Sequence, residues 1–176
     1  VALGNFDADG FSLTNDAALA VNGVVDGGSS TTLTTTTGNL TVNGTLKGTA
    51  VTLSSAGGIG EGAAGVIEAD TLAGHSQGDT LLGGANLVDT LNNFDATNFS
   101  FVNAQDLAVS GPLATGAGAG SISLKTSSGT LSVNDDLVAS AVALTSADGL
   151  TLTHNINATP VSPAAGGNIS QSACVI

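Results

Sequence analysis

The chain has 176 residues, of which 9% are charged and 3% aromatic, and its formal net charge is −12 at neutral pH. Its only Lys or Arg residues are Lys47 and Lys125, which excludes nucleic-acid binding and electrostatic binding to anionic lipid, because both require clustered cations. The 41% hydrophobic content argues against disorder, and the apolar runs are too short to span a membrane, so we expect no membrane insertion.

From the N-terminus, the first elements are short apolar–polar–apolar triplets, a pattern that predicts half-buried β-strands. Most triplets are followed by turn residues, with Asn-Gly at 22–23 and 43–44 and Gly-Gly at 57–58. We expect these residues to adopt positive φ at sharp corners. The residues predicted to point inward are Phe11 and Leu13, Leu19 and Val21, Leu40 and Val42, and Val51 and Leu53.

The same pattern begins again near Val88, which indicates an internal repeat. Copy one covers about residues 1–87 and copy two about residues 88–176. At an offset of 88, the matched pairs are Leu3 and Leu91, Asn5 and Asn93, Phe6 and Phe94, Phe11 and Phe99, and Leu19 and Leu107.

The offset then grows along the second copy. It becomes 91 where Leu40 and Val51 match Leu131 and Val142, which places a three-residue insertion near 116–120. It becomes 109 where the run ending at Ile67 matches the run ending at Ile176. The larger insertion, near 151–165, is close to the length of one coil of a β-solenoid, and such a fold accepts an extra coil because each coil contacts only its neighbours.

These observations predict an all-β fold, a right-handed parallel β-helix (β-solenoid) that forms one continuous segment over residues 1–176. Coils of about 20 residues would give roughly nine coils. Asn-Gly turns also occur in antiparallel hairpins, so a β-sandwich or barrel is the alternative. The repeat, the very short strands and the low aromatic content favour the solenoid.

The run GGIGEGAAGVIEADTLAGHSQGDTLLGGANLVDTLNNFDATNFSF, which starts at Gly57, resembles the repeats of filamentous-haemagglutinin-like exoproteins, the β-helix adhesins of two-partner secretion. The resemblance extends over nearly the whole chain. It implies an extracellular right-handed β-helix at the bacterial cell surface with an adhesive or biofilm role, and it carries over no catalytic residues.

Four aspartates are weak candidates for calcium ligands. Asp7 and Asp9 lie in FDADGF, which is similar to the start of a calcium-binding loop, although Ala18 stands where that loop needs a glutamate. Asp79 and Asp89 lie in a stretch similar to Gly-Asp calcium repeats, but their spacing is ten residues. A solvated turn is the simpler interpretation of each.

We otherwise predict no catalytic residues, no metal site and no cofactor. His75 and His154 have no histidine or cysteine at ligand spacing, and the single cysteine, Cys174, allows no internal disulfide. The predicted function is a non-catalytic structural or adhesive shaft that contacts a surface glycan or protein receptor. The alternatives are a fibre subunit that stacks end to end and, more remotely, a polysaccharide-processing β-helix enzyme, since that fold also hosts such enzymes.

Overall fold

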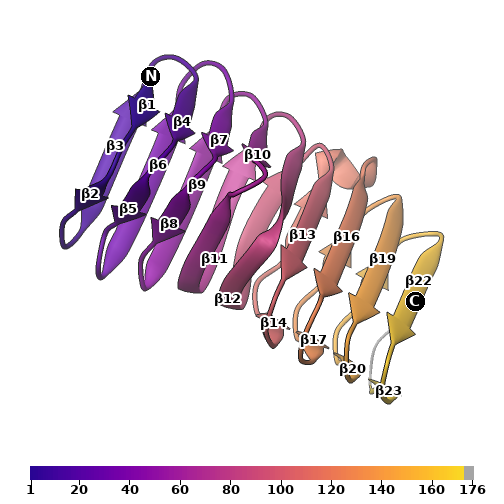
Figure 1. Cartoon of the computed structure of the whole chain (residues 1–176). Helices are drawn as coiled ribbons and strands as arrows, with labels where there is room; N and C mark the ends of the chain where they lie inside the picture. The colour runs from indigo at the N-terminus through magenta and orange to yellow at the C-terminus, as the bar shows by residue number, and fades with distance from the viewer. Residues whose placement is uncertain (173–176) are drawn as a thin grey trace.

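The computed structural model describes residues 1–172 and shows a parallel β-solenoid of about eight turns (Figure 1). All strand pairings in this range are parallel, so the predicted solenoid is confirmed and the antiparallel alternative is wrong. On the side that begins with β1 (Ala2–Leu3), strands stack at nine levels, and one turn of the chain separates each level from the next. The right-handed winding stays a prediction.

In the N-terminal half, each coil contains two short strands followed by a longer one. The first short strands after β1 are β4 (Leu19–Val21), β7 (Leu40–Val42) and β10 (Ile59–Glu61). The second short strands are β2 (Phe6–Asp7), β5 (Val24–Asp26) and β8 (Thr45–Lys47). The longer strands are β3 (Phe11–Asn15), β6 (Ser30–Thr35) and β9 (Ala50–Ser55).

In the C-terminal half, the same strand types recur after the longest strands of the molecule, β11 (Val66–Ser76) and β12 (Thr80–Ala96). The longer strands are β13 (Phe99–Asn103), β16 (Ser121–Thr126), β19 (Ala141–Ser146) and β22 (Val161–Ala165). The first short strands are β14 (Leu107–Val109), β17 (Leu131–Val133), β20 (Leu150–Leu152) and β23 (Ile169–Gln171). The second short strands are β15 (Leu113–Thr115), β18 (Leu137–Val138) and β21 (Ile156–Asn157).

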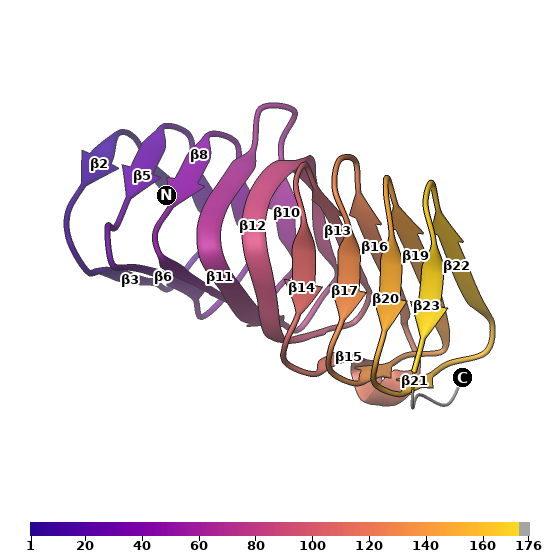
Figure 2. The same ribbon diagram turned by 90° about the horizontal axis from the view of Figure 1, so that it is seen from below.

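The two halves differ in which side of the solenoid carries the longer strands. Through β12, the longer strand β13 continues the stack of short strands β1, β4, β7 and β10. The longer strands β3, β6 and β9 are instead continued, through β11 and β12, by the short strands β14 and β15 (Figure 2). Equivalent strands of the two copies therefore lie on different sides.

This displacement follows from the repeat length. Residues paired on successive coils of the β1 side are 19 to 23 residues apart from Leu19 onward, except for Asn86 and Asn103, which are 17 apart across the irregularity in β12. The stack that contains Phe11 reaches Leu91 and then Val109, so its repeat counterpart Phe99 falls between two levels of that stack. A repeat of 88 residues thus spans four coils and nearly half of a fifth.

The core is one continuous column of buried aliphatic and phenylalanine side chains. Inward and outward residues alternate along most strands, as the triplets predict. The predicted inward residues are buried from Leu19 onward, whereas Phe11 and Leu13 in the first coil are only partly buried. Packing between neighbouring coils, rather than one central layer, therefore supplies the hydrophobic stabilisation.

Buried hydroxyl groups bind the backbone at the corners after the longer strands β6, β9, β16 and β19. Thr35 Oγ1 lies 3.0 Å from Ser55 Oγ, and both hydroxyls donate to the Gly38 carbonyl. Thr126 and Ser146 repeat this arrangement in copy two. Each hydroxyl thereby supplies a hydrogen-bond donor to a carbonyl at the corner.

Glycine has two different roles at the turns. Gly38 and Gly129 have φ near +76° and +79°, as expected for sharp corners. The predicted positive φ is wrong for the Asn-Gly turns: a Cβ on Gly44 would instead lie 2.2 Å from the carbonyl oxygen of Gly23 on the preceding coil. At these turns glycine is required by close backbone stacking between coils.

The predicted three-residue insertion coincides with a short 3₁₀ helix, η1 (Gly116–Gly118). The residues predicted as the extra coil, 151–165, contain β21 and β22 and stack in register on the coil before them. No helix among the described residues has the length and apolarity needed to cross a membrane.

Candidate functional site

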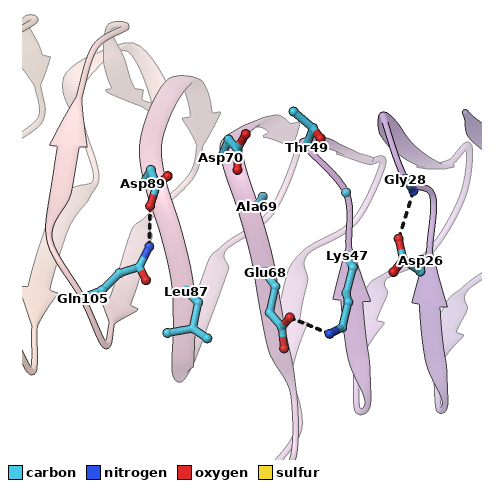
Figure 3. Close-up of a pocket in the computed structure, with 11 residues that line it drawn as sticks. Asp26, Gly28, Lys47, Thr49, Glu68, Ala69, Asp70, Leu87, Asp89 and Gln105 are labelled. Carbon is cyan, nitrogen blue, oxygen red and sulfur yellow. Dashed lines mark hydrogen bonds and ion pairs between the residues drawn. The ribbon is translucent and has the colours of Figure 1, made fainter. Parts of the chain in front are cut away.

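One surface groove, of about 380 Å³, runs across several coils of the N-terminal half (Figure 3). It lies at the corner between the second short strands and the longer strands. Strand register aligns Asp26, Lys47, Glu68 and Leu87 on successive coils along one wall. The residues that line the groove are Asp26, Gly28, Lys47, Gly48, Thr49, Glu68, Ala69, Asp70, Leu87, Asp89 and Gln105.

Acidic side chains dominate this groove, and Lys47 is the only lysine or arginine among the lining residues. Lys47 Nζ lies 2.6 Å from Glu68 Oε2, and the two side chains are each 35% exposed. The hydrogen bond from Lys47 to Glu68 raises the pKa of the lysine. Because this lysine already pairs with a carboxylate, it offers little positive charge to an anionic ligand.

Two further carboxylates of the groove accept hydrogen bonds from the protein. Asp26 Oδ1 accepts from the Gly28 amide at 2.9 Å, and Asp89 Oδ1 accepts from Gln105 Nε2 at 2.6 Å (Figure 3). These bonds hold the carboxylates against the wall of the groove. The resulting surface is negative, shallow and suited to weak contacts with cationic groups.

The structure separates the four candidate calcium ligands. Asp7 pairs in register with Asp26 near the first coil, and Asp89 lies in the groove itself. Asp9 accepts hydrogen bonds from the side chain and backbone of Ser29, which lower the pKa of its carboxyl group. Asp79 lies at another corner, where it accepts from Asn98 Nδ2 at 2.8 Å.

Among residues 1–172, no group of three or more His, Cys, Asp or Glu residues could hold a metal ion. The two histidines are exposed: His75 Nδ1 lies 3.9 Å from Asp95 Oδ2, and His154 Nδ1 lies 3.1 Å from the hydroxyl of Thr153. Cys174 lies outside the described residues.

A polar cluster that the sequence analysis missed lies where the longer strands change sides. Asn86 and Asn103 are paired in register inside the solenoid, and both are fully buried. Asn86 accepts from the amide of Ile67 and donates to Glu61 Oε2. Asn103 donates to the carbonyl of Val88 and accepts from its amide, so the two asparagines replace backbone pairing at the irregularity in β12.

Glu61 carries the least well-compensated charge of this cluster. Its Oε2 accepts from the Gly84 amide at 2.6 Å and from Asn86, whereas its Oε1 is buried with no hydrogen-bond partner. Burial raises the pKa of this carboxyl group, although the two hydrogen bonds act in the opposite direction. The signal in the sequence is a glutamate in register with Val42, at a position where other coils carry valine.

These sites consist of an acidic groove wall and a buried polar cluster formed by Glu61, Asn86 and Asn103. The chain matches no protein-family model, no curated protein and no solved structure.

Proposed function

We propose that this chain is a non-catalytic shaft segment of a large secreted bacterial surface protein, located outside the cell or on its surface, with an adhesive role. The single continuous core that runs through the stacked turns carries this proposal. Eight turns at about 4.8 Å per turn give a shaft about 40 Å long. A stiff column of this kind can hold a binding region away from the surface that anchors it.

The resemblance to filamentous-haemagglutinin-like exoproteins supports the secreted location and the adhesive role. The solenoid fold agrees with the fold that this resemblance implies. On this proposal the export route is two-partner secretion, and the partner is a glycan or protein receptor that is contacted weakly along the side walls.

The chemistry of the groove supports a non-catalytic role. A lyase that acts on acidic polysaccharides needs cations to hold carboxylates and to stabilise developing charge. The lysine of the groove is held by Glu68, and two of the carboxylates are held by hydrogen bonds within the protein. A polysaccharide-processing function would be revealed by release of reducing sugars from a panel of polysaccharides, where we expect none.

Two measurements on the purified chain test the proposal. Energy transfer between fluorescent dyes attached at Val1 and Ser172 should report a narrow distribution of distances centred at ~40 Å until the chain unfolds. Beads coated with the chain should be retained under flow on glycan- or protein-coated surfaces more than beads coated with an unrelated acidic protein. A broad distance distribution would contradict the shaft, and equal retention would contradict the adhesive role.

A second candidate is a fibre subunit that stacks end to end. The observation in its favour is that apolar residues of both end coils are exposed, with Phe6 at 41% and Ile169 at 49%. Light scattering and negative-stain imaging over a concentration series test this candidate. Filaments that grow with concentration would favour it over an isolated shaft.

A further inference from the structure

The upstream face of the first coil is an incompletely covered core layer. Phe6 is 41% exposed, and Leu3, Phe11 and Leu13 are only partly buried. Within residues 1–172, β1, β2 and β3 each pair with a strand on the downstream side only. Their other edges leave backbone donors and acceptors available for another strand.

Copy two shows the same coil in a fully covered state. The downstream neighbours of the two coils are equivalent, and the matching register pairs are Leu3–Val21 and Leu91–Val109, Phe6–Val25 and Phe94–Leu113, and Phe11–Thr31 and Phe99–Ile122. The ring contact is also equivalent, with centroids 4.5 Å apart for Phe6 and Phe11 and 4.7 Å apart for Phe94 and Phe99. Yet Phe94 and Phe99 are each only 2% exposed.

The upstream neighbours make this difference. Leu72 lies in register with Leu91, and Gly74 with Phe94. A Cβ on Gly74 would lie 2.7 Å from the ring of Phe94, so only glycine lets the coil close over the phenylalanine. Further along, Thr80 lies in register with Phe99, and Leu82 with Phe101.

From this equivalence we infer that the upstream face of the first coil is a docking surface for a β-solenoid coil of the type formed by residues 71–82. Such a coil places leucine over Leu3, glycine over Phe6, threonine over Phe11 and leucine over Leu13. It also places a histidine beside Asp7, as His75 lies beside Asp95. Parallel strand pairing would supply the backbone hydrogen bonds. The glycine would make the surface selective for such a coil, because a larger residue at that position would collide with the ring of Phe6.

A second copy of the chain fits this face less well. Its last described coil presents Val161, Pro163, Ala165 and Ile169. In that coil the longer strand, β22, lies on the side where the first coil has the short strand β1. The interaction concerns only the upstream face of the first coil, so it can hold or fail independently of the adhesive role proposed above.

The test is the full chain extended by a copy of residues 68–88 placed directly before Val1. Hydrogen exchange at residues 2–15 should slow by about tenfold or more and approach the rates of residues 90–103. The matched control is the same extension with Gly74→Leu in the added copy only, which should leave the exchange of residues 2–15 fast. Exchange at residues 110–160 reports in both proteins whether the rest of the solenoid is folded.

Either of two results with the extended chains would overturn the inference. One is equal exchange at residues 2–15 with and without the extension. The other is equal protection by the glycine extension and the leucine extension, which would mean that any added chain covers the face. Protection of the unextended chain that rises with its concentration would identify a second copy as the occupant and would likewise overturn it.

Discussion

The first coil and its counterpart in copy two have similar sequences and equivalent downstream neighbours, but they differ in burial. Phe6 is 41% exposed and Phe94 is 2% exposed, because β11 and the first residues of β12 lie upstream of the second coil and no described strand lies upstream of the first. In a solenoid, a residue is stabilised by the coils on both of its sides. Substitutions at sequence-matched positions of the two coils therefore measure how much an upstream coil contributes to the free energy of unfolding.

The largest expected difference is between Phe94→Ala and Phe6→Ala. Loss of the buried ring should cost about 3–5 kcal/mol of unfolding free energy, because a cavity remains between two coils. Loss of the half-exposed ring should cost about 1–2 kcal/mol, since it removes less buried area. Denaturant unfolding of both variants checks this, and equal losses would show that the upstream coil adds little.

The next difference concerns the asparagines that end the longer strands. Asn15 and Asn103 both donate to the two carbonyls that follow, two and three residues downstream. Asn103 also exchanges two hydrogen bonds with Val88. Asn103→Ala should therefore cost about 1–3 kcal/mol, because it leaves buried backbone groups without partners.

Asn15→Ala should cost less, about 1 kcal/mol or below, because its bonds are exposed to solvent. Native-state hydrogen exchange can compare the two variants, with the Val88 amide as the local probe. If that amide stays protected in Asn103→Ala, the bond across the coils is not what stabilises the irregularity in β12.

A smaller effect, dependent on pH, is expected at Glu61, the glutamate at the level where the longer strands change sides. Burial raises the pKa of its carboxyl group above 4.5, so the folded state binds more protons than the unfolded state in the pH range just above that value. This contribution to stability is present at lower pH and is lost as pH rises through the raised pKa.

Glu61→Gln removes that titration and keeps an acceptor for the Gly84 amide. The variant should be at least as stable as the parent chain at pH 7 and should lose this advantage towards pH 4.5. Thermal unfolding over that pH range, with the exposed Asp95→Asn as the control, measures the difference. A parent chain that gains stability from pH 4.5 to 7 relative to Glu61→Gln would contradict the prediction.

The smallest effect is expected at the ion pair of the groove. Lys47 matches Val138 in copy two, where the second short strand carries no cation. Lys47→Val should change the unfolding free energy by about 1 kcal/mol or less, because exposed ion pairs contribute little. The change should shrink further in 1 M salt. A larger loss that persists in high salt would show that the lysine stem, rather than its charge, supports the groove.

The parallel fold and its inward residues could be predicted because alternation and repetition are visible locally. Leu40, Val42, Leu131 and Val133 occupy equivalent buried positions, as the sequence indicates. The change of side between the copies could not be predicted in this way. It depends on how a repeat of 88 residues compares with coils of 17 to 24 residues, and coil lengths are known only once strands are paired.

The polar cluster formed by Glu61, Asn86 and Asn103 also could not be predicted from the sequence alone. Asn86 reaches Asn103 only because the register of β12 shifts between Leu82 and Asn86. Glu61 stands at a position that the alternation assigns to an apolar residue, and nothing local indicates that Gly84 and Asn86 lie beside it. Because the strand register is irregular here, the residues of this cluster are not separated by a regular number of residues, and no repeat period in the sequence reveals them.

The half-coil displacement between the copies also sets the directions in which the shaft can be approached. Outward residues of the longer strands, such as Thr32 on β6 and Ser123 on β16, belong to equivalent positions but face different sides of the column. A partner that bound these outward residues would therefore contact copy one and copy two on different sides of the shaft.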